Sequence, residues 1–228
     1  MSNFLLASIG RKFMMSITGL FLLMFITVHL ALNLLLVFDD SGELFNIGAH
    51  FMATNPLIKI MEPVLGLGFV IHIIWSLIIT YQNWRARPVK YNKQSLSESS
   101  TWASRNMFIL GGLVFVFLVM HIIDFFYVMK FDTHSMSTVI IDGVEMEDGY
   151  KLVSELFIGC KLFGVLYILG AILLALHLTH GFWSAFQTLG LNNKNWINRL
   201  KWIARIFAIL IGLGFAIIPL YFMLGFNN

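Results

Sequence analysis

Long runs of apolar residues alternate with short polar segments along the 228-residue chain. Five runs are long enough for an α-helix to cross the hydrocarbon layer of a membrane, which takes roughly 20 residues. The pattern therefore predicts an all-α fold, with residues 1–228 forming a single domain built as a bundle of five transmembrane helices. The first run continues for 26 residues without a cleavage site of small residues, which favours a retained span over a signal peptide. The predicted spans are residues 13–38, 63–83, 106–129, 156–188 and 206–226.

Composition agrees with a membrane protein. Hydrophobic residues make up 58% of the chain and charged residues 12%, and the mean hydropathy is +0.82, which is far from the values of soluble domains. The one cysteine, Cys160, has no partner in the chain, which excludes an internal disulfide, a thiolate zinc site and an iron–sulfur cluster held by this chain alone. None of the polar loops is long enough to suggest a catalytic domain.

Basic residues collect in alternate polar segments. The N-terminal tail and the second and fourth loops hold eleven of the fifteen Lys and Arg residues and one acidic residue, Glu98. The positive-inside rule then predicts a cytoplasmic N-terminus and a C-terminus outside. The net charge of +3 is thereby explained by membrane topology, and no nucleic-acid partner is expected. The eleven basic residues are Arg11, Lys12, Arg85, Arg87, Lys90, Lys93, Arg105, Lys194, Arg199, Lys201 and Arg205.

Histidines lie deep inside four of the five predicted spans. Counting about 1.5 Å per residue from the cytoplasmic end of each span, His29 and His121 lie about 24 Å deep, and His72 and His177 about 18 Å deep. A single histidine in a span can simply hydrogen-bond a carbonyl or pack at a helix interface. Two pairs at two depths are instead typical of two stacked haems, each held by an imidazole on either face. The pattern predicts an inner haem between His72 and His177 and an outer haem between His29 and His121.

Glycines precede two of these histidines at the same spacing. Gly19 stands ten residues before His29, and Gly111 ten residues before His121. The interval is about 15 Å along a helix, and a missing Cβ there would let a flat macrocycle lie against the backbone. Ordinary packing of small residues between membrane helices is the alternative. We prefer the haem interpretation because the histidines agree with it.

Polar groups near the inner ends of the spans are candidate partners for the anionic propionates of the haems, which are costly to bury unpaired. The absence of a Cys-x-x-Cys-His motif predicts that both haems are b-type. Basic residues at these positions are equally expected as topology signals. The candidates are Arg11, Ser16, Arg105 and His180.

Four motifs carry a resemblance to a known family. In order and spacing they resemble the dihaem cytochrome b membrane subunit of succinate dehydrogenases and fumarate reductases, over most of the chain. The family's His-x-x-x-Gly pattern matches His177 and Gly181 and leaves His180 as an extra histidine. Some members carry a glutamate two residues before this ligand, where Ala175 stands here. The motifs are "RKFMMSITGLFLLMFITVHL", "FVIHIIWSLIITYQNWRARP", "SRNMFILGGLVFVFLVMH" and "HLTHGFWSAFQTLG".

The resemblance implies a membrane anchor in a bacterial cytoplasmic membrane. Its partners would be an FAD-containing flavoprotein subunit and an iron–sulfur subunit, and it would carry electrons between them and menaquinone or another quinone. The chain would thus be the non-flavin membrane subunit of a succinate:quinone oxidoreductase. It would hold no catalytic residues for succinate and would not oxidise succinate alone.

Because a quinone exchanges two protons while a haem passes only electrons, a titratable side chain is expected near the outer haem. His50, in "FNIGAHFMATNP" just before the second span, is the leading candidate since imidazole exchanges protons near neutral pH. It could instead be an exposed loop histidine or a partner of an outer propionate. Glu62 and Asp124 lie at the same level, although Asp124 could simply pair with Lys130 or Lys59.

Two other functions fit parts of the pattern. A proton-coupled transporter would use the buried histidines as a relay. Transporters commonly have broken helices in repeated halves, whereas only Pro63 and Pro219 interrupt the spans here. A dihaem anchor of another quinone-reactive oxidoreductase, such as a hydrogenase or formate dehydrogenase, would share the haem chemistry and differ in its soluble partner.

Overall fold

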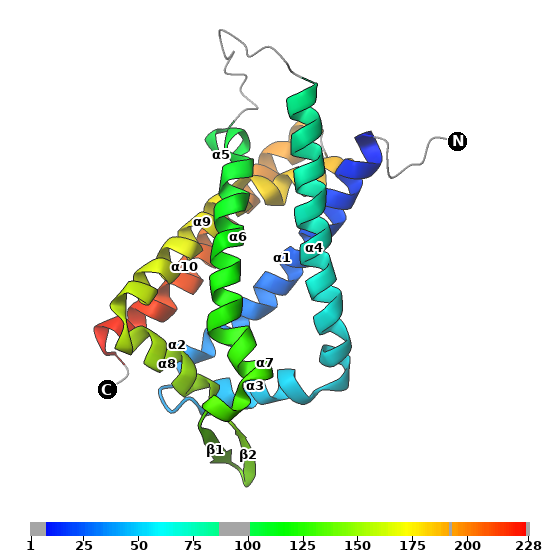
Figure 1. The fold of residues 1–228 in the computed structure, drawn as a ribbon. Coiled ribbons are helices and arrows are strands. Elements are labelled where there is room, and N and C mark those ends of the chain that lie inside the picture. The colour runs from blue at the N-terminus through cyan, green and yellow to red at the C-terminus, as the bar shows by residue number, and fades with distance from the viewer. Residues whose placement is uncertain (1–7, 87–100, 192, 227–228) are drawn as a thin grey trace.

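The computed structural model describes residues 8–86, 101–191 and 193–226. Five of its helices are long and apolar enough to cross a membrane, which confirms the predicted bundle, and the chain is a multi-pass membrane protein. The spans run at different tilts, with α1 crossing behind α4 and α6 (Figure 1). Their bounds are Ile9–Phe38, Pro56–Arg85, Met107–Phe131, Lys161–Thr188 and Asn195–Leu224.

The first two spans are joined by a separate helix. The first span consists of α1 (Ser8–Asn33) and the short α2 (Leu35–Phe38), after which α3 (Glu43–Thr54) leads to α4 (Pro56–Arg85). The side chain of Asn55 caps α4 by accepting from the Leu57 and Ile58 backbone N–H groups, and Pro56 suits the first position because it has no N–H to satisfy. The second span therefore begins before the predicted residue 63.

The third span changes helix type midway. The short α5 (Trp102–Arg105) precedes it, and the span itself contains α6 (Met107–His121), the π-helical segment η2 (Ile122–Tyr127) and α7 (Val128–Phe131). A π-helical turn within an α-helix is rare and frequently marks a functional site. Here it begins directly after His121.

The predicted starts of the fourth and fifth spans are also wrong. A single helix was expected over residues 156–188, but α8 (Gly149–Gly159) ends at Cys160, whose backbone is extended, and α9 (Lys161–Thr188) starts afresh. The fifth span, α10 (Lys194–Leu224), starts well before residue 206 because the Asn193 side chain caps it by accepting from the Trp196 N–H. The basic residues assigned to the fourth loop therefore lie on the first turns of a helix.

A small β-hairpin departs from the all-α prediction. It follows the single turn η3 (Thr133–Ser135) and pairs β1 (Thr138–Ile141) with β2 (Val144–Glu147) in antiparallel register. Asp142 and Gly143 both have positive φ, at 51° and 78°, as the tight turns that suit the twist of a hairpin require. The hairpin protrudes at one end of the bundle, here called the hairpin end (Figure 1). The opposite end, where α1 begins, is called the N-terminal end.

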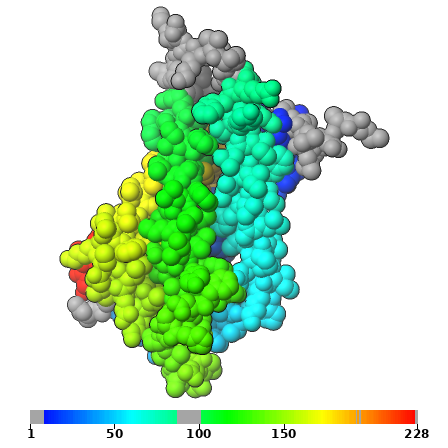
Figure 2. Space-filling model, viewed as in Figure 1, coloured from blue at the N-terminus to red at the C-terminus, as the bar shows by residue number. Residues whose placement is uncertain are grey.

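The hydrophobic core lies between α1, α9 and α10. Helix α10 packs along α9, and α1 contacts both α4 and α9. One cluster of buried side chains joins α1, α9 and α10 through Leu23, Leu30, Leu178, Ala208 and Ile211. By contrast, Gly68 and Leu110 are the only buried residues among those described in α4 and α6. These two helices form much of the face in Figure 2.

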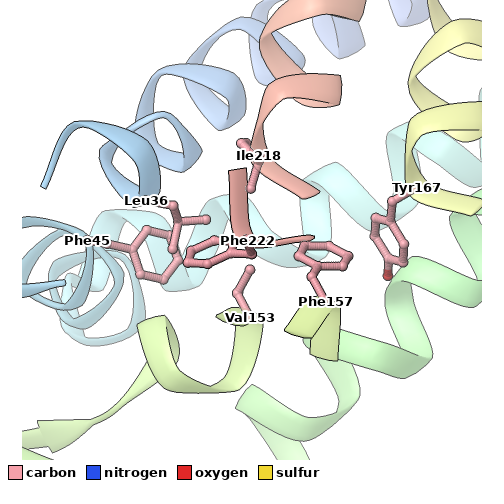
Figure 3. Close-up of a cluster of buried hydrophobic side chains, with 7 residues drawn as sticks. All are labelled: Leu36, Phe45, Val153, Phe157, Tyr167, Ile218 and Phe222. Carbon is pink, nitrogen blue, oxygen red and sulfur yellow. The ribbon is translucent and has the colours of Figure 1, made fainter. Parts of the chain in front are cut away.

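A second cluster closes the hairpin end, where α2, α3 and α8 meet α9 and α10 (Figure 3). Buried Asn46 ties α3 to α8, since its amide donates to Asp148 at 3.0 Å and accepts from the Tyr150 N–H at 2.9 Å. At the start of α3, hydrogen bonds from the Ser41 hydroxyl and the Leu44 N–H hold the pKa of the Asp39 carboxyl below its usual range. The cluster contains Leu36, Phe45, Val153, Phe157, Tyr167, Ile218 and Phe222.

Candidate functional site

The two histidines predicted to share the outer site do meet. His29 of α1 and His121 of α6 have ring centroids 5.7 Å apart and ring planes at 87°. Phe25 stacks on His29 at 5.2 Å, and Phe215 of α10 approaches it at 5.8 Å. Phe125 packs edge-on against His121 at 5.5 Å. The pair therefore sits in an aromatic surrounding supplied by three spans.

The spacing of this pair has a chemical meaning. An imidazole nitrogen binds a transition metal at about 2 Å, so two imidazoles on opposite sides of one iron would have ring centroids roughly 6 Å apart. The observed 5.7 Å between the His29 and His121 rings is close to this value. His29 and His121 are therefore the residues that would hold the outer haem iron, and their spacing is compatible with that role.

The other two histidines each lie against a glycine of a neighbouring span. A Cβ placed on Gly19 would lie 3.7 Å from His72 Cε1, and one on Gly111 would lie 3.6 Å from His177 Cε1. His72 and His177 are also near enough to interact electrostatically. A Cβ on Gly112, by contrast, would meet nothing within 4 Å. Gly19 of α1 thus lies beside His72 of α4, and Gly111 of α6 lies beside His177 of α9, each at a distance where a Cβ would make ordinary van der Waals contact.

These contacts correct the depth estimate. His72 lies at the level of Gly19, ten residues from His29 along α1, so the two sites are about 15 Å apart along that helix. The distance between Gly111 and His121 along α6 gives the same separation. Counting from predicted span ends gave only about 6 Å. The count failed because the spans run at different tilts, so equal numbers of residues do not reach equal depths (Figure 1).

Thr18 is a site residue that sequence reasoning missed. Its Oγ1 lies 3.2 Å from Nδ1 of His72, across the interface between α1 and α4. The side chain is buried, with 7% of the residue exposed. A polar residue inside a span is a possible signal for such a role, but its partner is 54 positions away in the sequence.

The candidates for propionate binding lie toward the N-terminal end of the bundle. The ring of His180 packs edge-on against Trp183 at 4.9 Å, and the Lys201 ammonium lies 5.2 Å from the same indole. The buried Ser16 hydroxyl donates to the Lys12 carbonyl at 3.0 Å. Arg11 is half-buried and Arg105 is exposed. Their role toward a propionate stays a prediction.

The three quinone-site candidates have separate surroundings near the hairpin end. His50 lies on α3 and not in a loop, and its Nδ1 is buried without a hydrogen-bond partner in the described part of the chain. Glu62 forms an ion pair with Lys130 at 2.7 Å, so the suggested pairing of Asp124 with Lys130 is wrong. Asp124 instead accepts a hydrogen bond from the Tyr167 hydroxyl at 2.8 Å.

Tyr167 was not foreseen, although it links two parts of the site. Besides its hydrogen bond to Asp124, its ring lies 6.1 Å from that of His121. Tyrosine in an apolar span usually needs a partner for its hydroxyl group. The sequence offers that general expectation but does not identify Asp124 as the partner.

Within the described residues, no group of three or more His, Cys, Asp or Glu side chains could hold a bare metal ion. A haem iron differs, because the macrocycle supplies its other ligands and two histidines suffice. No protein-family model, curated protein or solved structure matches the chain.

Proposed function

We propose that the chain is a dihaem cytochrome b that anchors the soluble subunits of a succinate:quinone oxidoreductase in a membrane. The observation that carries the proposal is the close pair of His29 and His121, which come from two different spans and have a spacing compatible with one iron. The inner pair adds a second site about 15 Å away along the bundle. Both pairs involve α4 or α6, the spans that contribute least to the buried core.

The residues fit haem better than they fit a proton relay. A haem needs flat, apolar space and one imidazole on each face, and aromatic side chains surround His29 and His121 while glycines lie beside His72 and His177. When bound, a haem accepts and donates single electrons. The protein's part is to hold the iron through imidazole nitrogens and to exclude water with residues such as Phe25 and Phe215. Both haems are b-type.

The soluble partners follow from the motif resemblance. They are an FAD-containing flavoprotein subunit and an iron–sulfur subunit, docked at the N-terminal end on the cytoplasmic side of a bacterial membrane. Arginines are held over exposed indoles there, with Arg199 at 5.6 Å from the Trp196 ring and Arg205 at 5.1 Å from Trp202. Such basic groups would steer an acidic partner surface by long-range attraction.

The quinone site belongs at the hairpin end, near the outer haem. This position separates the electron entry at one end of the bundle from the proton-exchanging groups at the other. His50, Glu62 and Asp124 all lie there, on α3, α4 and η2. Menaquinone or another membrane quinone is the substrate.

The native complex tests this function. The chain is purified with its partners from membranes under mild detergent, and visible spectra are recorded before and after succinate is added. We expect succinate to reduce b-type haem and a quinone to reoxidise it. Haem that is reduced by dithionite but not by succinate would point to the anchor of another oxidoreductase, and a preparation without haem absorption would favour the transporter.

A further inference from the structure

The contact between Thr18 and His72 determines which nitrogen of this histidine carries a proton. The Thr18 hydroxyl has one proton to donate and two lone pairs that accept. Its Oγ1 lies 2.8 Å from the Met14 carbonyl oxygen and 3.2 Å from that of Met15, both within its own helix. Because carbonyls only accept, the hydroxyl proton is used there.

In its contact with His72, the Thr18 hydroxyl oxygen must then accept a hydrogen bond and cannot donate one. With its proton donated to α1, Oγ1 can only accept across the 3.2 Å to His72 Nδ1. The Nδ1 of His72 therefore carries the hydrogen and donates it. The other ring nitrogen, Nε2, is left with a free lone pair, which is the form of imidazole that binds a metal.

None of the other three ligand histidines has such a partner within the described residues. The Nδ1 of His177 is buried without a hydrogen-bond partner. His29 has the Asn33 amide nitrogen 3.4 Å from its Nδ1, but an amide nitrogen only donates, so it cannot accept a hydrogen from this ring. The rings around His121 are aromatic. Of the two histidines of the inner site, His72 is therefore held by a hydrogen bond to another helix, and His177 is not.

We propose that Thr18 is a positioning residue for the inner haem, fixing His72 in the Nε2-binding tautomer and orientation and strengthening its electron donation to the iron. A hydrogen bond accepted from the distal N–H of a ligand histidine makes the ring more basic. More electron donation favours the ferric state, so the hydrogen bond lowers the reduction potential of the inner haem. This inference rests on the proposed function, since it requires that the haems are bound.

The test compares threonine variants of α1 in the purified complex. Thr18→Val removes the hydroxyl and keeps the branched shape, whereas Thr18→Ser keeps the hydroxyl. Thr27→Val is the matched control, because the Thr27 hydroxyl also bonds a carbonyl of its own helix, at 2.8 Å to Leu23, and lies on an exposed residue. The readout is a redox titration followed in the visible spectrum, with the inner haem identified by its loss in a His72→Ala variant.

In Thr18→Val we expect the inner haem to titrate at a higher potential than in the unmodified protein and the outer haem to be unchanged. Thr18→Ser and Thr27→Val should both titrate like the unmodified protein. Loss of the inner haem in Thr18→Val alone would also support the positioning role. An unshifted inner potential in Thr18→Val, or equal loss of haem in Thr27→Val, would overturn the inference. Absence of haem from the unmodified complex would instead refute the proposed function.

Discussion

At the residue scale, the two histidines of "HLTHGFW" have different surroundings. His177 lies beside the Gly111 position and near His72, whereas His180 packs on Trp183. We therefore expect His177→Ala to lose the inner haem, so that about half of the total haem remains. His180→Ala should keep both haems. The haem content per chain is measured for both variants. If the inner haem is retained in His177→Ala and lost in His180→Ala, the assignment is reversed.

His50 is expected to exchange protons with the quinone. Its Nδ1 is buried without a partner in the described part of the chain, near the end of the bundle assigned to the outer haem. His50→Gln should lower quinone turnover by roughly 100-fold, the usual contribution of a positioned acid–base group. Both haems and the transfer of electrons from succinate to an artificial acceptor should be preserved.

The matched control for His50 is His134→Gln, because His134 is an exposed histidine of η3 at the same end. This variant should turn over quinone like the unmodified complex. If His50→Gln also keeps full quinone turnover, the quinone site lies elsewhere, and the N-terminal end next to the iron–sulfur subunit is the alternative.

The sequence revealed the four histidines because polar residues are rare within spans, and their shared spacing to glycines added a second signal. It also paired His29 with His121 as the structure does. Thr18 and Tyr167 escaped notice because their polar partners, His72 and Asp124, lie on other spans. No periodicity within one helix carries that information.

At the element scale, the two neighbouring glycines of α6 provide a test of the inner pair. A Cβ at Gly111 would just touch His177, at 3.6 Å, so the further carbons of valine would displace the imidazole. Gly111→Val should therefore reduce inner-haem content strongly. Gly112→Val introduces the same side chain one position along, where a Cβ meets nothing within 4 Å, and should retain both haems. Equal haem content in the two variants would show that the contact with His177 is unimportant.

Five spans were predictable from apolar length, but their ends were not. The helix break at Cys160 was hidden because α8, which lies outside the span, also presents an apolar face, with Val153 and Phe157 buried in the cluster at the hairpin end. The β-hairpin could have been expected from Asp142-Gly143 between β-branched residues. It was missed because the apolar runs dominated the pattern.

At the scale of the whole molecule, Cys160 can report the topology without any substitution. It is the one cysteine of the chain, is exposed, and lies at the start of α9, on the side predicted to face outward. A membrane-impermeant maleimide should label Cys160 in cells whose outer envelope is permeabilised while the cytoplasmic membrane stays intact. Cys160→Ser is the control for background labelling. Labelling only after the cytoplasmic membrane is permeabilised would invert the predicted topology.

The central claim is that four histidines hold two haems, and the haem-to-protein ratio of the purified chain tests it most directly. The pairs His29–His121 and His72–His177 predict two b-type haems per chain. His29→Ala and His121→Ala should each lower the ratio to one by removing the same haem, and His72→Ala and His177→Ala should each remove the other. A ratio of one or none in the unmodified protein, or variants of one pair that remove different haems, would contradict the account.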